Sequence, residues 1–159
     1  MVARDIMRKD APTLKPGDPL CHAAKTMLST GCSEVAVVDG NGGLVGLLTE
    51  ADVLRATLPT YVDGLDLSFL PSSFDFPAEG SDLQTITVAQ ALRNEAHEVV
   101  SEDDPLVEVA RVIAQEHVIA CPVVARGAEE DKPGRYVGII NYSDLLRYVL
   151  SSCLGQGEA

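Results

Sequence analysis

The sequence lacks tryptophan, and aromatic residues make up only 4% of its 159 residues. It is also poor in basic residues, since 12 Lys and Arg stand against 24 Asp and Glu and give a formal net charge of −12. A chain this acidic repels the phosphate backbone of nucleic acids and anionic lipid surfaces. Its apolar runs are too short for a membrane span. We therefore expect no nucleic-acid partner and no membrane partner, while a single bound nucleotide stays compatible with this charge.

The sequence also lacks the spacings typical of metal sites. Its three histidines are scattered, and its four cysteines form no CxxC pair. We expect reduced thiols and no bound metal. The N-terminus has no charged segment followed by an apolar stretch of the kind that a secretory signal needs, so the expected compartment is the cytoplasm.

Signatures of catalysis are missing as well. The chain contains neither GxGxxG nor GxxxxGK[ST], and no Ser or Cys lies in a recognisable nucleophile elbow. Cys21 and His22 are neighbours on a predicted helix, where consecutive side chains point about 100° apart and cannot form a dyad. The sequence therefore predicts a protein that is not an enzyme.

An internal duplication is the main positive feature. The stretch Gly46-Leu47-Leu48-Thr49-Glu50-Ala51-Asp52 returns 92 residues later as Gly138-Ile139-Ile140-Asn141-Tyr142-Ser143-Asp144. Upstream, Asp18-Pro19-Leu20 returns as Asp104-Pro105-Leu106 at an offset of 86 residues. The difference between these two offsets predicts six extra residues in the second copy, in the polar loop 126–135.

Each copy reads as helix, strand, helix, strand, strand, helix. Apolar residues at helical spacing predict the helices, with Asp18 or Asp104 as N-cap and the following proline in the first turn. Apolar β-branched runs on either side of a short polar loop predict a β-hairpin in each copy. The fold class is therefore α/β (α+β). We expect motif 1 over 1–58, a linker over 59–86, motif 2 over 87–150 and a frayed tail over 151–159.

The linker holds all three phenylalanines and, from about Pro59 to Thr85, no Lys or Arg. Its aromatic residues either fix it to the rest of the molecule or make it a lid or a segment that docks a partner. The sequence leaves both readings open.

Thr49 with Asp52, and Asn141 with Asp144, have the spacing of a capping box at a helix start. The same place offers free N–H groups to a phosphate, and an Asp there can accept hydrogen bonds from the two hydroxyls of a ribose. Both readings stand. An arginine follows each Asp by three residues and could either pair with it across the helix or bind a ligand phosphate: these are Arg55 and Arg147.

Taken together, the two copies resemble a stand-alone tandem pair of CBS (cystathionine-β-synthase-type) motifs. The stretches that carry the resemblance are Asp18-Pro19-Leu20, Val35-Ala36-Val37-Val38-Asp39, Ile119-Ala120-Cys121-Pro122-Val123-Val124 and the two repeats that end at Asp52 and Asp144. The resemblance implies two βαββα motifs packed as a pseudo-twofold pair with two clefts between them, commonly as a homodimer. Ligands in this family are chiefly AMP, ADP, ATP and S-adenosylmethionine.

By position, the resemblance matches Asp52 and Asp144 to the ribose-binding Asp, and Thr49 to the residue that helps hold ribose or phosphate. It places the base near the residues Thr13, Val35, Ala36, Val37, Val99, Cys121, Pro122 and Val123. Two departures stand out: Asn141 replaces the usual Thr or Ser, and Ala36 stands where the second copy has Pro122, so the clefts should differ.

A run of acids without Lys or Arg would disfavour a polyphosphate if it faced a cleft: Glu98, Glu102, Asp103, Asp104 and Glu108. We therefore expect AMP or a less charged adenosyl ligand. The leading hypothesis is a non-enzymatic ligand sensor that signals to an unknown regulated protein. The alternative is a ligand-independent dimerising scaffold that docks a partner through its linker.

Overall fold

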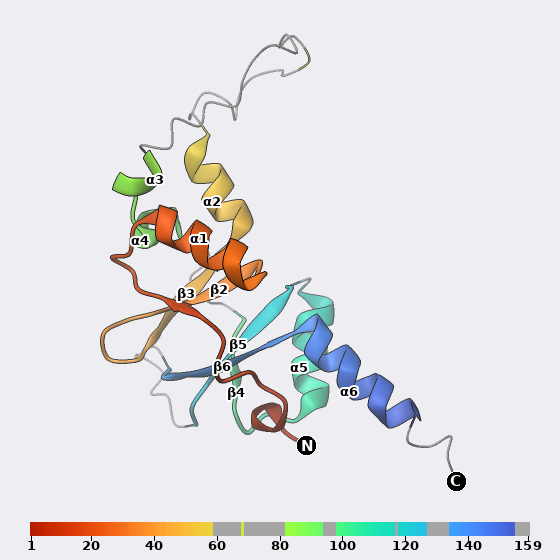
Figure 1. The fold of residues 1–159 in the computed structure, drawn as a ribbon. Coiled ribbons are helices and arrows are strands. Elements are labelled where there is room, and N and C mark those ends of the chain that lie inside the picture. The colour runs from red at the N-terminus through yellow and green to blue at the C-terminus, as the bar shows by residue number, and fades with distance from the viewer. Residues whose placement is uncertain (59–67, 69–81, 94–97, 117, 127–133, 155–159) are drawn as a thin grey trace.

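The computed structural model describes residues 1–58, 68, 82–93, 98–116, 118–126 and 134–154. It contains the expected order of elements twice (Figure 1). The first set is η1 (Ala3–Asp5), β1 (Thr13–Leu14), α1 (Leu20–Thr30), β2 (Glu34–Val38), β3 (Leu44–Thr49) and α2 (Glu50–Thr57). After α3 (Asp82–Thr85), the second is α4 (Val88–Ala91), β4 (Val100–Ser101), α5 (Leu106–Gln115), β5 (Ala120–Val124), β6 (Tyr136–Asn141) and α6 (Tyr142–Leu154). The mixed α+β class and the duplication are confirmed.

Two small sheets repeat the same topology. In each, a short first strand pairs in parallel with the second, which forms the expected antiparallel hairpin with the third. The register places Ala36 opposite Leu47 in one sheet and Pro122 opposite Ile139 in the other. A register shift also recurs at the same point, after Val37 and after Val123. The internal symmetry therefore extends to single residues.

The long helices begin differently from the sequence-based prediction. Pro19 and Pro105 themselves occupy the N-cap positions with extended backbones, instead of the first helical positions. The Asp before each proline closes the preceding turn, since the Asp18 carboxylate accepts from the Lys15 N–H at 2.8 Å. The end of α1 is as expected, because Gly31 takes the left-handed φ of 70° that a glycine adopts without steric cost.

Each sheet packs one face against helices, and a third apolar cluster joins the two sheets around Ala36, Leu44 and Val124. The sheets also meet at their edges, where the Leu44 N–H donates to the Gly134 carbonyl and the Tyr136 N–H to the Gly42 carbonyl, both at 2.9 Å. The two motifs are therefore held as a pair by apolar packing and by backbone hydrogen bonds.

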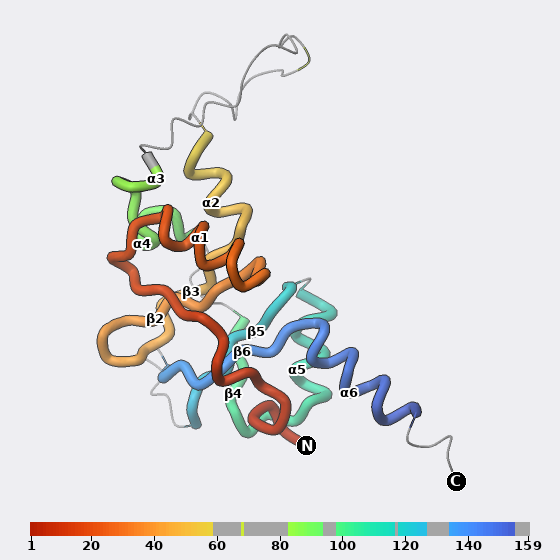
Figure 2. The backbone as a smooth tube through the Cα atoms, in the orientation of Figure 1, coloured from red at the N-terminus to blue at the C-terminus, as the bar shows by residue number. Residues whose placement is uncertain are grey.

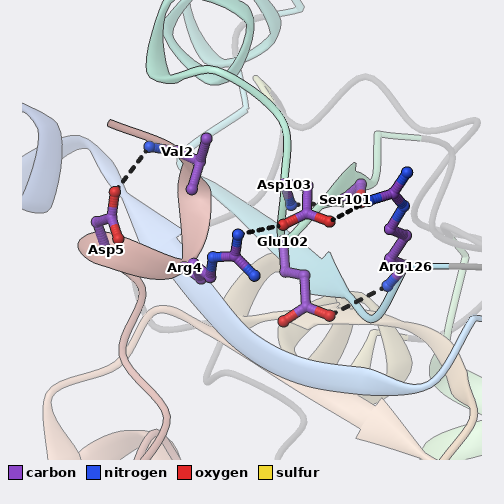
Figure 3. Close-up of polar contacts among 7 residues, drawn as sticks. All are labelled: Val2, Arg4, Asp5, Ser101, Glu102, Asp103 and Arg126. Carbon is purple, nitrogen blue, oxygen red and sulfur yellow. Dashed lines mark hydrogen bonds and ion pairs between the residues drawn. The ribbon is translucent and has the colours of Figure 1, made fainter.

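The opening segment of each motif packs on the other motif, which the sequence did not predict. Ala3 belongs to the core of the second motif, and Val88 and Ala91 belong to the core of the first. Figure 2 shows the N-terminal segment beside β4 and α5 before the chain crosses to α1. Arg4 fastens this segment through an ion pair with Asp103 at 2.7 Å, and Arg126 reaches the same carboxylate at 3.5 Å (Figure 3).

Equivalent backbone hydrogen bonds fix the alignment of these opening segments. The Leu106 N–H donates to Met1 as the Leu20 N–H donates to Ile86, and the Ala3 N–H donates to Asp104 as the Val88 N–H donates to Asp18. The structural offset here is therefore 85 residues, one less than the 86 that apolar spacing suggested.

The expected linker and tail are partly structured. At the end of the linker, α3 contacts α1 and α2, and Leu83 packs on the first core. At the other end of the chain, α6 continues to Leu154 and includes four residues of the expected tail. The three phenylalanines, His117 and most of the loop with the six extra residues lie outside the described residues.

Candidate functional site

Both expected capping boxes are present. At the start of α2, the Thr49 hydroxyl accepts from the Asp52 N–H and the Asp52 Oδ2 accepts from the Thr49 N–H, each at 3.1 Å. At the start of α6, the Asn141 Oδ1 accepts from the Asp144 N–H at 3.0 Å and the Asp144 Oδ2 accepts from the Asn141 N–H at 2.9 Å. Asparagine therefore preserves the geometry that threonine provides in the first copy. Such N-caps stabilise a helix by about 1 kcal/mol each.

The two carboxylates have different cationic partners. Asp52 is only 5% exposed, and its Oδ1 accepts from Arg55 Nη1 at 3.1 Å, so the pair across the helix, one of the two alternatives for Arg55, forms here. Arg147 is exposed and makes no ion pair with any residue that the structure describes. The partner of Asp144 is Arg8, whose Nε lies 3.3 Å from Oδ2 without the alignment of a hydrogen bond.

Sequence reasoning missed Arg8 and its counterpart Arg93. The offset of 85 residues places the two arginines at equivalent positions, and each comes from an opening segment that packs on the other motif. Arg93 lines a hollow of about 130 Å³ beside Asp52, together with Arg55, Ala56, Gln90 and Ala91. Each carboxylate thus faces an arginine that lies far from it in the sequence. The matched position of Arg8 and Arg93 in the two copies is the one sequence signal that could have identified them. The offset of 86 residues concealed this match, because the two arginines lie 85 residues apart.

The residues expected near a base are placed mainly in the cores. Val35 and Val37 are buried in the first core, and Cys121 and Val123 in the second. Ala36 and Val99 belong to the cluster between the sheets, and Pro122 is fully buried. Thr13 is exposed and pairs with Ala36. Because the core side chains are covered, a ligand could meet Val35, Val37, Cys121 and Val123 only through their backbone.

Two further polar side chains are partly buried, Glu34 close to Asp52 and Tyr136 on β6. Glu34 lies opposite Thr49 in the sheet, and its Oε2 has no hydrogen-bond partner among the described residues. Burial raises the pKa of the Glu34 carboxyl group; a hydrogen bond with the Ala120 backbone opposes this rise, and the charge of Asp52 adds to it. The Tyr136 hydroxyl is likewise buried without a described partner, and burial raises its pKa to about 12.

Four of the five acids expected to disfavour a polyphosphate are engaged in ion pairs or hydrogen bonds on β4, α5 and the turn between them. Asp103 pairs with Arg4 and Arg126, and Glu108 with Arg111. Glu102 and Asp104 accept backbone N–H groups from Arg126 and Ser101. None of these acids lines the hollow beside Asp52.

The buried thiol of Cys121 is poorly suited to nucleophilic chemistry. Burial raises the pKa of the Cys121 thiol to about 12, and its Sγ donates to the Glu98 carbonyl at 3.1 Å. Within the described part of the chain, no group of three or more His, Cys, Asp and Glu side chains could hold a metal ion. No helix there is both long and apolar enough to cross a membrane.

Comparisons with known proteins agree with this architecture. A CBS domain-containing protein of Dictyostelium discoideum is 26% identical over 146 residues, which cover 92% of this chain and 89% of that protein. A homoserine O-acetyltransferase of Methanococcoides burtonii is 26% identical over 145 residues, and the chain spans only 23% of that enzyme's length.

Solved structures share the fold. A CBS domain-containing protein of Kribbella flavida has a TM-score of 0.72 at 24% identity, with coverage of 94% of this chain and 99% of that one. CBSX2 in complex with AMP has a TM-score of 0.67 at 21% identity, with coverage of 94% and 96%. The model of the CBS domain family matches residues 3–58 and 88–151. The chain therefore belongs to the CBS domain family and carries two CBS motifs in tandem.

Proposed function

We propose that this chain is a non-enzymatic regulatory module that binds an adenosine ligand in the clefts between its two CBS motifs. The observation that carries the proposal is the repeated arrangement at Asp52 and Asp144. In both places a capped helix start holds a carboxylate close to an arginine from the opposite motif. A ribose binds to the carboxylate through its two hydroxyls, and a phosphate binds to the cationic groups.

AMP is the ligand that we favour, with ADP, ATP and S-adenosylmethionine as the other candidates. The clefts offer few cations, Arg55 and Arg93 at the first and Arg8 at the second, which suits one phosphate better than three. The structurally similar CBSX2 was solved with AMP. Charge-assisted hydrogen bonds contribute roughly 1.5–3 kcal/mol each, a substantial share of the ~8 kcal/mol of a micromolar complex.

Signalling requires the ligand to favour one arrangement of the motifs over another. Arg8 and Arg93 reach the clefts from segments that lead directly into the opposite motif, so a ligand that contacts them also fixes how the motifs pack. An unknown regulated protein reads that change. We place this protein in the cytoplasm, which suits its four free thiols.

The experiment is isothermal titration of the purified protein with AMP, ATP and S-adenosylmethionine. Micromolar binding of AMP that weakens at least about tenfold in Asp52→Asn or Asp144→Asn, from the loss of one charge-assisted hydrogen bond, supports the proposal. The variants must keep the thermal stability of a folded protein. Unchanged affinity in both variants would remove the ribose-binding role from these carboxylates.

A second candidate function, a dimerising scaffold, is favoured by one surface. Helices α5 and α6 form an apolar groove of about 450 Å³ on the second motif, lined by Met1, Pro105, Leu106, Val107, Ala110, Leu145, Tyr148 and Val149. On the first motif, Leu83 and Ile86 pack against the corresponding core. We infer that a second copy of the chain covers the groove, which makes a homodimer part of either function. The linker to which a partner would bind lies outside the described residues.

A further inference from the structure

The two clefts differ in how their arginines are used. Arg8 is held in place by two backbone hydrogen bonds with Ile139, at 2.9 and 3.1 Å, and its guanidinium group lies 3.3 Å from the Asp144 carboxylate. One positive charge here faces one negative charge. Asp144 Oδ1 accepts no hydrogen bond among the described residues, so it can receive a ribose hydroxyl while Arg8 neutralises the carboxylate.

In the first cleft the corresponding arginine, Arg93, is not engaged by any residue that the structure describes. Asp52 is paired with Arg55 of its own helix, so Arg93 is a second cation beside a carboxylate that already has a partner. Arg93 is exposed and forms no ion pair with any described residue. Glu34, the other acid close to Asp52, does not line the hollow. The groups that line the hollow therefore carry a net charge of one positive unit.

The hollow beside Arg93 has the size and chemistry of an anion subsite. At about 130 Å³ it is well below the roughly 300–1,000 Å³ of pockets that enclose a whole small-molecule ligand. It suits a single phosphate group next to a ribose that is bound at Asp52. Two guanidinium groups bind a phosphate well because each presents N–H donors in a planar fork.

We propose that Arg93 binds the 5′-phosphate of the ligand in the first cleft. The second cleft, whose arginine pairs with Asp144, then binds adenosine nearly as well as AMP. This inference rests on the proposed function. It assigns the two clefts to different ligand classes: phosphorylated adenosine compounds at Asp52, and adenosyl compounds with or without a phosphate at Asp144.

The test measures each cleft separately by isothermal titration with AMP and with adenosine. Asp144→Asn leaves the first cleft in use, and Asp52→Asn leaves the second. In the Asp144→Asn background, AMP should bind at least about tenfold more tightly than adenosine, as one charge-assisted hydrogen bond allows, and Arg93→Gln should abolish this preference. Arg147→Gln is the matched control, because that arginine is exposed on α6, and it should leave the preference unchanged.

In the Asp52→Asn background, AMP and adenosine should bind within about threefold of each other, because Arg8, the arginine that faces the second cleft, is already engaged with Asp144. Three results would overturn the inference while the proposed function stands: a preference for AMP that survives Arg93→Gln, its equal loss in Arg147→Gln, or a strong phosphate preference at the second cleft. Failure of the unmodified protein to bind either compound would overturn both. Thermal melting of each variant confirms that it is folded.

Discussion

At the scale of one residue, the protonation of Glu34 makes the free energy of unfolding depend on pH. Its carboxyl group is partly buried, and burial raises its pKa above the ordinary value of 4.5. In the folded protein the group therefore keeps its proton at pH values where the unfolded chain has lost it. The contribution of Glu34 to the free energy of unfolding should be highest below 4.5 and should fall as pH rises through the window between 4.5 and the raised pKa.

We predict that Glu34→Gln stabilises the protein at neutral pH. The amide can still accept a hydrogen bond from the Ala120 backbone and carries no charge to be desolvated, so a gain of about 1 kcal/mol is expected. Urea unfolding at pH 4 and pH 7.5 measures this, with Asp10→Asn, an exposed carboxylate, as the control. A variant that is less stable than the parent at pH 7.5 would contradict the prediction.

The thiols give a second prediction at this scale. Cys121 is buried and its pKa is raised to about 12, so it forms almost no thiolate near neutral pH, whereas Cys153 is exposed. An alkylating reagent at pH 8 should modify Cys153 quickly and Cys121 only after the protein unfolds. Peptide mass spectrometry at successive times follows both sites. Equal rates at the two cysteines in the folded protein would be inconsistent with this structure.

At the scale of elements, the contact between the N-terminal segment and β6 depends on a glycine. A Cβ at Gly138 would lie 2.9 Å from the Arg8 carbonyl oxygen and 3.0 Å from the Met7 sulfur. Both are shorter than an ordinary van der Waals contact, and the carbonyl belongs to the backbone pair that positions Arg8.

We predict that Gly138→Ala destabilises the protein by about 1–3 kcal/mol, the usual cost of an overpacked site. Gly40→Ala is the matched control, because a Cβ there meets nothing within 4 Å. Denaturant unfolding compares the two variants. Similar stability in both would show that the N-terminal segment does not pack against β6 as described.

How much of these elements the sequence predicts depends on the range of the interaction. The capping boxes at Thr49 and Asn141 were predictable because their partners lie three residues apart, and the hairpins because apolar strands flank a short loop. The pairing of Arg8 with Asp144 was not predictable, because it depends on how the opening segments cross between the motifs. The alignment of those segments was also one residue in error, since apolar spacing on a single turn fixes a register poorly.

At the scale of the whole molecule, α6 distinguishes the two halves. It has no buried residue, and its exposed apolar side chains follow helical spacing: Leu146, Val149, Leu150 and Leu154. A continuous apolar stripe on a 13-residue helix marks an interaction surface.

We predict that Val149→Glu weakens self-association at least about tenfold, because it places an unpaired charge in an apolar contact. Sedimentation velocity over a range of concentrations measures the dissociation constant. Leu28→Glu provides the control, since Leu28 is 82% exposed on α1 of the other motif. A monomeric parent protein, or equal effects of both substitutions, would exclude the α5–α6 face as the interface.

The duplicated architecture makes each candidate cleft a joint product of both motifs, and ligand binding at Asp52 and Asp144 is the central proposal that rests on it. A crystal structure of the protein grown with saturating AMP tests this most directly. We expect the ribose hydroxyls within hydrogen-bond distance of one or both of these carboxylates, with the phosphate of the first cleft against Arg93 and Arg55. Nucleotide density elsewhere, or clefts that stay empty at saturation, would contradict the account.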